Sequence, residues 1–201
     1  MADRKRNVGI VVFDGVEVLD FAGPYEVFSV AGEVIDPGAF NVYLIAESAN
    51  TIVGRNDFRV EPHHTFSDCP EPDIFLVPGG PGTRIEENRP EMVDWVSARA
   101  ESAELVLSVC TGARILAKAG LLDGLEATTH WVSIDELKEM APAATVHDNR
   151  RFVDNGKVVT SAGVSAGIDM SLHIVARLCG EKAATETAHF MEYDGYKREA
   201  A

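Results

Sequence analysis

A strand meets a helix within the segment Glu104-Leu-Val-Leu-Ser-Val-Cys110-Thr-Gly112-Ala-Arg-Ile-Leu-Ala-Lys-Ala-Gly120. Its apolar first half is typical of a buried strand, and the residues from Thr111 onward have helical composition. Cys110 stands at the corner between them. The small residues Ser108 and Gly112 lie two positions to either side, where they relieve the crowding of a sharp turn. The segment therefore predicts a nucleophile elbow with Cys110 as its reactive residue.

At such a corner, we expect the Cys110 thiol to face the unpaired N–H groups of the following helix, whose partial positive charge favours thiolate over thiol. The amide of Thr111 is also placed to donate to an oxyanion. The alternative is that Cys110 is a small buried hydrophobic residue, the commoner role of an unpaired cysteine. The flanking small residues favour the nucleophile. Cys69, in a Ser-Asp-Cys-Pro loop, and Cys179, near a helix end, are expected to be packing or incidental residues.

Short β-branched runs alternate with stretches of helical period along the rest of the chain. This alternation predicts an α/β three-layer sandwich, in which helices cover both faces of a mostly parallel sheet, and residues 1–201 are expected to form one domain. The expected strands are residues 7–13, 41–46, 74–77, 105–109 and 158–161, and the expected helices are residues 20–30, 90–100, 111–119, 132–140 and 163–178. Residues 51–60 and 145–153 are each expected to form a small edge hairpin.

A second buried strand ends in the glycine-rich loop Pro78-Gly-Gly-Pro-Gly82. Glycine lets backbone amides approach a ligand closely, although the loop lacks the spacing of a nucleotide-binding motif and is equally compatible with a simple tight turn. In an open α/β sheet, ligands bind beyond the carboxyl ends of the strands, where this loop and Cys110 would both lie. We therefore expect the amides of Gly79 and Gly80 to be oxyanion donors.

Composition excludes several classes of function. The chain has 32 acidic and 18 basic residues and a formal net charge of -14, so neither nucleic acid nor membrane is an expected partner. The apolar run after Arg4-Lys5-Arg6 is too short for a signal peptide, and no apolar stretch is long enough to span a membrane. Three cysteines without CxxC spacing indicate reduced thiols in the cytoplasm, and the absence of an HExxH pattern argues against a catalytic metal.

Several motifs together resemble the ThiJ/PfpI (class I glutamine amidotransferase-like) superfamily over nearly the whole chain. They are residues 9–28, the Val77-Pro-Gly-Gly80 loop, Ser108-Val-Cys-Thr-Gly-Ala113, and residues 119–124, 127–131 and 161–169. The resemblance implies a flavodoxin-like fold and a homodimer with its pocket near the subunit boundary. The helix from Asp20 to Val30, which carries Tyr25 and Phe28, is a candidate contact surface for that dimer.

Two features narrow the resemblance. Proteases of the superfamily carry a histidine after the nucleophile, where this chain has Thr111, and the acid near the thiol, often glutamate, is Asp20 here. Both features are similar to the isocyanide hydratase (isonitrile hydratase) branch, which converts R–N≡C to an N-substituted formamide without a cofactor. The resemblance implies that the Cys110 thiolate attacks the terminal carbon, that Asp20, with a raised pKa, donates a proton, and that Thr111 orients water. Asp20 can also serve as a helix N-cap.

Other residues of the expected pocket come from the same resemblance. His130, in Thr-Thr-His-Trp, matches a family histidine near the nucleophile, and either lines the pocket or bonds a backbone carbonyl. Gly163 and Val164 belong to the motif at 161–169, in which Asp169 would cap or orient the turn. The remaining histidines are expected to be structural or exposed: His63 and His64 in a loop, and His147, His173 and His189.

The resemblance leaves three functions open. The first is a Cys-dependent lyase of the isonitrile hydratase type that acts on a small electrophilic molecule. The second is a stand-alone ligand- or redox-sensing domain related to AraC-type regulators, although no basic helical extension follows Lys197-Arg198, so no DNA-binding apparatus is expected. The third is a glyoxalase-like or deglycase-like enzyme that acts on reactive carbonyls. Protease or amidase activity is the least favoured, because the histidine after the nucleophile is missing.

Overall fold

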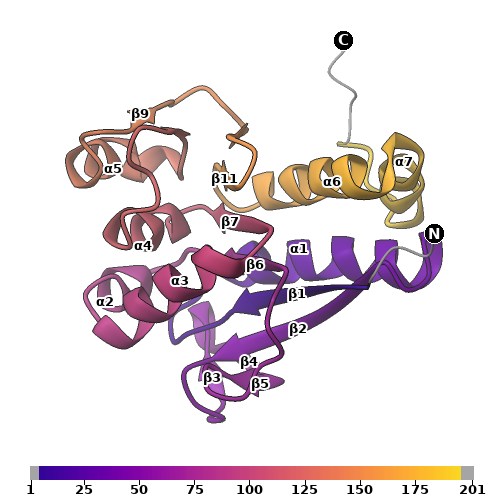
Figure 1. The fold of residues 1–201 in the computed structure, drawn as a ribbon, viewed down its shortest axis with the longest axis horizontal. Coiled ribbons are helices and arrows are strands. Elements are labelled where there is room, and N and C mark those ends of the chain that lie inside the picture. Colours follow the sequence, from indigo (N-terminus) through magenta and orange to yellow (C-terminus); the bar gives the residue numbers. More distant parts are fainter. Residues whose placement is uncertain (1–4, 196–201) are drawn as a thin grey trace.

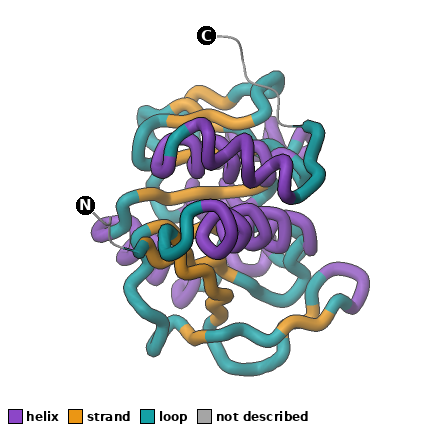
Figure 2. Tube along the Cα trace, turned by 90° about the vertical axis from the view of Figure 1, so that its right-hand side faces the viewer, coloured by secondary structure: helices purple, strands orange, loops and turns teal. Residues whose placement is uncertain are grey.

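The structure, a computed structural model, describes residues 5–195, and Figure 2 draws the two ends of the chain in grey. Arg4, Lys197 and Arg198 therefore lie outside the described residues, as do the expectations that rest on them. Within the described part, no helix combines the length and the apolar composition that crossing a bilayer requires.

A seven-stranded sheet organises the chain (Figure 1). Its order is β10-β11-β7-β6-β1-β2-β5, and every neighbouring pair is parallel except β10 and β11. The five inner strands repeat the flavodoxin-like order 2-1-3-4-5, which confirms the predicted fold class. The strands are β1 (Arg6–Val11), β2 (Phe40–Ala46), β5 (His64–Thr65), β6 (Ile74–Val77), β7 (Leu105–Val109), β10 (Phe152–Asp154) and β11 (Val158–Ser161).

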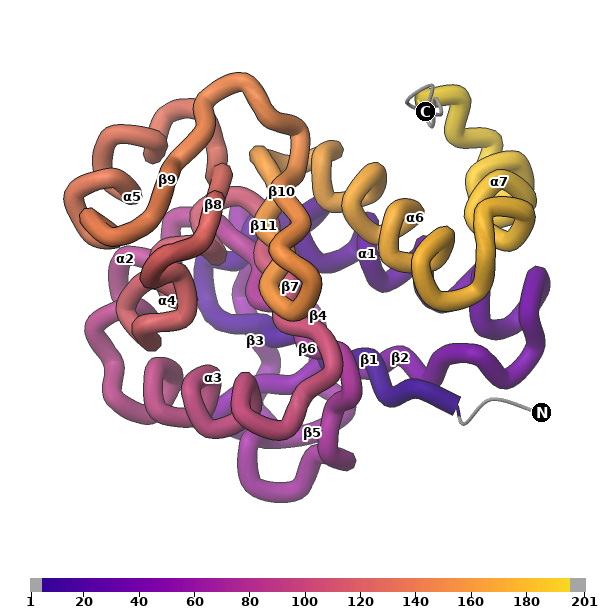
Figure 3. The backbone as a smooth tube through the Cα atoms, turned by 45° about the horizontal axis from the view of Figure 1, so that its top comes forward, coloured from indigo at the N-terminus to yellow at the C-terminus, as the bar shows by residue number. Residues whose placement is uncertain are grey.

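Helices lie on both sides of this sheet (Figures 1 and 3). Helices α1, α6 and α7 pack against one another on one face, and α2, α3 and α5 gather around α4 on the other. Their bounds are α1 (Val18–Val30), α2 (Thr83–Glu86), α3 (Pro90–Ser102), α4 (Gly112–Lys118), α5 (Ile134–Met140), α6 (Ala166–Cys179) and α7 (Glu181–Phe190). A π-helical turn, η1 (Ala31–Ile35), continues α1.

The central strands are apolar on both faces because both faces are covered. Every residue of β6, β7 and β11 is buried, which explains why their sequences form continuous apolar runs rather than an alternating pattern. One hydrophobic cluster joins these strands to the helices. It includes Phe28, which is fully buried and packs against Phe40. The expectation that Phe28 lies on a dimer contact surface is therefore wrong.

The two predicted hairpins have different outcomes. β3 (Ile52–Val53) and β4 (Arg59–Val60) pair antiparallel, which confirms the hairpin at 51–60. The hairpin at 145–153 is wrong, since β9 (Thr145–Val146) pairs in parallel with β8 (Glu126–Ala127), whereas β10 joins the edge of the main sheet. Both halves of that segment find partners elsewhere in the chain, which a local alternating pattern does not identify.

Several element boundaries also differ from the sequence prediction. α1 begins at Val18 rather than at residue 20, and α6 begins three residues later than expected because Val164 has a φ of 53°, which is incompatible with a right-handed helix. α2 and α7 were not predicted; Gly180, with a φ of 91°, separates α7 from α6. His64 lies in the edge strand β5 rather than in a loop.

The buried centre of the sheet generates a stability prediction. Leu107 lies in β7 and is fully buried, so Leu107→Ala should lower the free energy of unfolding by about 2–5 kcal/mol. Val34→Ala removes apolar atoms from a residue that is 46% exposed and should change it by less than about 0.5 kcal/mol. Urea titration followed by circular dichroism measures both, and equal effects would contradict this account of the core.

Candidate active site

Cys110 occupies a strained corner between β7 and α4. Its φ is 57°, in the left-handed region that costs a non-glycine residue about 1–3 kcal/mol. Hydrogen bonds on both sides hold this conformation: the Cys110 amide donates to the carbonyls of Ser161 (3.2 Å) and Ala162 (3.1 Å), and the Thr129 hydroxyl donates to the Cys110 carbonyl (2.7 Å). A Cβ on Gly112 would collide with the Val77 carbonyl. The predicted elbow is therefore present, and the fold supports its strain.

Asp20 lies beside the thiol and has no exposed surface. Its Oδ2 accepts a hydrogen bond from the Gly79 amide (3.0 Å), whereas Oδ1 has no hydrogen-bond partner of standard geometry among the described residues. Burial raises the pKa of Asp20 from 3.8 to about 7, although interactions with Gly79, the Cys110 side chain and the Val164 amide act in the opposite direction. The raised pKa agrees with the sequence prediction. The N-cap role is wrong, because α1 begins two residues earlier and Glu17 is its N-cap.

The Cys110 thiol is protonated at rest. Burial and the neighbouring Asp20 carboxyl raise the pKa of Cys110 to about 12, and the opposing interactions with the Thr111 amide and hydroxyl are weaker. Cys110 is only 6% exposed, so desolvation of a thiolate outweighs the partial positive charge of the short helix α4. The Thr111 amide does favour the thiolate, in the direction that was expected, but burial and the Asp20 carboxyl outweigh it. The pair can instead pass the thiol proton to Asp20, which keeps one negative charge on the two groups together.

The glycine-rich loop holds the site residues rather than presenting free amides. The Gly79 amide donates to Asp20, and the Gly80 amide donates to Thr111 Oγ1 (2.9 Å). A Cβ on Gly79 would lie within 2.8 Å of Asp20 Oδ2 and closer still to Thr111, which explains why glycine is needed there. The prediction that these two amides are oxyanion donors is wrong for this structure, because both already donate within the protein.

Thr111 belongs to a chain of hydroxyl groups. It is buried, and the Thr83 hydroxyl lies 3.0 Å from its Oγ1 and 2.7 Å from the Gly80 carbonyl. The sequence prediction missed Thr83 and Thr129, both buried. Thr129 stands in the Thr-Thr-His-Trp motif, which could have drawn attention to it, whereas Thr83 reaches the site only because α2 packs on α4.

His130 and the turn at Gly163 and Val164 lie beside the same pair. The His130 ring packs so closely on Gly163 that a Cβ there would overlap it, and Nδ1 accepts a hydrogen bond from the Val132 amide (3.3 Å). Partial burial lowers the pKa of His130, so the imidazole is neutral at pH 7. Val164 has a positive φ, a genuine outlier for a β-branched residue, and its amide faces Asp20. The structure therefore brings Val164 next to Asp20 and Gly163 next to His130.

Two charged residues near the site were not predicted. Arg55 and Glu17 form an ion pair of 2.6 Å. Glu17 contributes to the raised pKa of Asp20, and both Cys110 and Asp20 act electrostatically on Arg55. Arg55 lies in η2 (Arg55–Asp57), inside the β3–β4 hairpin, and its amide donates to the Val16 carbonyl. Sequence patterns gave no signal for it because the hairpin and α1 come together only in the fold.

The remaining candidates lie elsewhere. Cys69 and Cys179 are half-buried, and Asp169 receives a hydrogen bond from Tyr193 and pairs with Arg151. His147 contacts Glu126, and His173 contacts Asp154. Within residues 5–195, no group of histidine, cysteine and carboxylate side chains has the arrangement of a metal site.

Comparisons with known proteins agree with this geometry. The sequence profile of the DJ-1/PfpI family matches residues 6–177. The chain is 34% identical to isonitrile hydratase from Pseudomonas putida, over 93% of this chain and 78% of that protein. It is 24% identical to the HTH-type transcriptional regulator GbdR from Pseudomonas aeruginosa, over 96% of this chain but only 52% of the regulator.

Two further relatives complete the comparison. The glutathione-independent glyoxalase DJR-1.2 from Caenorhabditis elegans is 26% identical over 75% of this chain and 80% of that protein. The crystal structure of a ThiJ/PfpI family protein from Pseudomonas syringae superimposes with a TM-score of 0.86 at 29% identity, and the match covers 98% of this chain and 78% of that one. With the family profile matching most of its length, the chain belongs to the DJ-1/PfpI family.

Proposed function

We propose that this chain is a cofactor-independent enzyme that adds water to an isocyanide and releases an N-substituted formamide. The observation that carries the proposal is the buried pair of Cys110 and Asp20, in which a thiol lies next to a carboxyl whose pKa is about 7. Such a carboxyl can both accept and donate a proton near neutral pH. The 34% identity to isonitrile hydratase supports the choice of substrate class.

In the first step, sulfur adds to the terminal carbon of R–N≡C. The thiol proton passes to Asp20 as the C–S bond forms, and Asp20 then delivers it to the same carbon, so the product is the thioimidate R–N=CH–S–Cys110. The unpartnered Oδ1 of Asp20 is the atom available for this transfer. No redox change occurs, and the site returns to a single negative charge.

In the second step, water adds to the thioimidate carbon. Asp20 accepts a proton from the water and donates one to the nitrogen, which gives R–NH–CH(OH)–S–Cys110. The C–S bond then breaks, the hydroxyl proton returns to sulfur through Asp20, and R–NH–CHO leaves. The sum is R–NC plus H₂O giving R–NH–CHO, and each proton moves through the same carboxyl.

The surrounding residues hold this geometry in the proposed reaction. Gly79 fixes the orientation of Asp20 through Oδ2, so that Oδ1 stays available. Thr111 contributes its amide and hydroxyl next to sulfur, where they can orient water. The neutral imidazole of His130 and the backbone at Gly163 and Val164 would form the wall of the pocket. The proposal also includes a homodimer and a cytoplasmic location, where thiols stay reduced.

Two relatives favour other uses of the same thiol. The similarity to GbdR covers almost the whole chain but about half of that regulator, which favours a ligand-sensing domain that binds an electrophile without turnover. The similarity to a glutathione-independent glyoxalase favours a reaction of the thiol with a dicarbonyl. Both alternatives use Cys110, so they differ from the hydratase in substrate and turnover rather than in nucleophile.

Steady-state assays test the hydratase directly. The purified protein should convert cyclohexyl isocyanide to N-cyclohexylformamide, detected by gas chromatography. Cys110→Ala should abolish turnover, and Asp20→Asn should lower kcat by roughly 10²-fold or more, because the proposed proton shuttle is lost. Cys69→Ala should retain full activity, since that thiol lies outside the site. Absence of formamide with the parent protein would exclude the hydratase, and production of lactate from methylglyoxal would support the glyoxalase alternative.

The pH dependence of Cys110 alkylation tests the proton transfer. The rate with iodoacetamide should rise as pH increases through about 7, because ionised Asp20 can then accept the thiol proton, and should level off above it. Asp20→Asn should remove this rise and leave only the increase that accompanies ionisation of the thiol itself at higher pH. Mass spectrometry of the Cys110 peptide separates it from the other thiols. A parent profile without an inflection near pH 7 would contradict the assignment of Asp20 as base.

The buried carboxyl should also destabilise the fold as it ionises. Since the pKa of Asp20 is raised from 3.8 to about 7, its effect is absent below pH 3.8, grows between these two values and is complete above the upper one. In a denaturant titration at pH 8, Asp20→Asn should therefore have a higher free energy of unfolding than the parent, by at most about 4 kcal/mol. No such gain is expected at pH 4. An equal gain at both pH values would show that charge is not the cause.

A further inference from the structure

A buried arginine lies one helical turn beyond the nucleophile corner. Arg114 is on α4, and its side chain is 9% exposed. Its Nε and Nη2 donate to the two carboxylate oxygens of Glu87, at 2.6 and 2.7 Å. This fork of two parallel hydrogen bonds is specific to the planar guanidinium, and lysine cannot reproduce it. Arg114 therefore holds the end of α2 firmly against α4.

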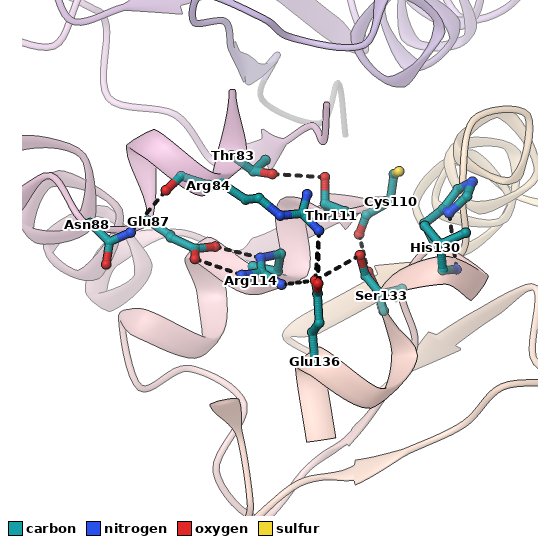
Figure 4. A network of polar contacts seen from close by, with 12 residues as sticks. Thr83, Arg84, Glu87, Asn88, Cys110, Thr111, Arg114, His130, Ser133 and Glu136 are labelled. Carbon is teal, nitrogen blue, oxygen red and sulfur yellow. Dashed lines mark hydrogen bonds and ion pairs between the residues drawn. The ribbon is translucent and has the colours of Figure 1, made fainter. Parts of the chain in front are cut away.

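The same guanidinium reaches a second carboxylate on another helix. Arg114 Nη1 contacts Glu136 on α5, which also accepts hydrogen bonds from Arg84 (2.9 and 3.0 Å) and from the Ser133 hydroxyl (3.3 Å). Figure 4 shows Arg114 between Glu87 and Glu136. Three helices that are separate in sequence thus meet at one buried cation.

Each of these helices carries or adjoins a residue of the Cys110 site. Thr111 is the N-cap of α4, and Thr83, whose hydroxyl contacts it, begins α2. His130 is the N-cap of η3 (Trp131–Ser133), which leads directly into α5. Figure 4 shows Cys110, Thr111 and His130 at one side of the network. The relative positions of these groups therefore depend on how α2, α4 and α5 are held together.

Stability alone is a weak reason for this arrangement. Burial of charged groups carries a desolvation cost that their mutual attraction often only matches, and apolar replacements of similar volume can be neutral or stabilising. The paired hydrogen bonds between Arg114 and Glu87 have a defined geometry, so they instead fix the relative positions of the helices that they join.

We infer that Arg114 is a positioning residue for the Cys110 site: it fixes the Thr111 hydroxyl and the His130 ring relative to the thiol by joining α2 and α5 to α4. The inference rests on Cys110 being the reactive thiol of the proposed function, but not on the identity of its substrate. It adds to the site a residue that touches neither the thiol nor its carboxyl partner.

The double variant Arg114→Met/Glu87→Met tests the inference without leaving a buried charge unpaired. Glu136 keeps Arg84 and Ser133 as partners, so only the connection through α4 is lost. Arg114→Lys is the companion variant, which keeps the charge but not the fork. Arg177→Met is the control, because Arg177 lies on α6 and pairs with Asp154 of β10, neither of which belongs to this network.

Circular dichroism and thermal unfolding first verify that each variant is folded. Three measurements then report on the Cys110 site. In the double variant, the Cys110 peptide should react with iodoacetamide at a rate changed by a factor of about five or more, because its surroundings no longer have a fixed position. The pKa of His130, read by NMR and assigned with His130→Gln, should move from its lowered value toward 6.5. If isocyanide is turned over, kcat/KM should fall at least about tenfold, and Arg114→Lys should be intermediate.

The outcomes separate this inference from the proposed function. Changes in alkylation and in the His130 pKa without any isocyanide turnover in the parent would support the positioning role and exclude the hydratase. A folded double variant whose alkylation rate, His130 pKa and turnover all match the parent would overturn the inference, and so would equal changes in Arg177→Met. If the double variant does not fold, Arg114→Lys decides by the same three measurements.

Discussion

The proposed chemistry depends on two acidic groups, Cys110 and Asp20, that share a buried site. Cys110 and Asp20 are both almost inaccessible to water, and two negative charges in such a place would be strongly unfavourable. Burial is the largest cause of the raised pKa of each group, about 12 for Cys110 and about 7 for Asp20, and the Asp20 carboxyl raises that of Cys110 further. The pair keeps one negative charge and exchanges a proton, which suits the proposed reaction, in which the thiol gives up its proton as sulfur attacks and regains it as sulfur leaves.

The parallel sheet is what brings this pair together. Cys110, Gly79 and Val164 follow the carboxyl ends of β7, β6 and β11, and Asp20 follows β1, so all four meet at one edge of the sheet. Two of them, Cys110 and Val164, have positive φ angles. The hydrogen bonds of Cys110 to the end of β11 and to Thr129 hold the first of these against its intrinsic preference.

The residues around Cys110 and Asp20 are held in place by two kinds of interaction. Asp20 and Thr111 are held by backbone amides of the glycine-rich loop, whereas the helices around them are joined through the buried guanidinium of Arg114. The backbone hydrogen bonds fix the positions of single side-chain atoms, whereas Arg114 fixes the relative positions of whole helices. In the proposed reaction, Cys110 and Asp20 must exchange a proton over a short distance, which needs both kinds of restraint.

The sequence by itself determined the elements with strong local signals: the central strands, the elbow at Cys110, the family motifs around Asp20 and His130, and the hairpin at 51–60. Sequence-based prediction failed where a residue interacts with a partner from a distant part of the chain. The tertiary structure alone decided that the Gly79 and Gly80 amides bind Asp20 and Thr111, and that the segment at 145–153 pairs elsewhere. It also brought Thr83 and Arg55 near the site and made Arg114 a link between the helices around it. Periodicity and turn composition report local preferences, whereas hydrogen-bond partners and desolvation depend on which elements the fold places side by side.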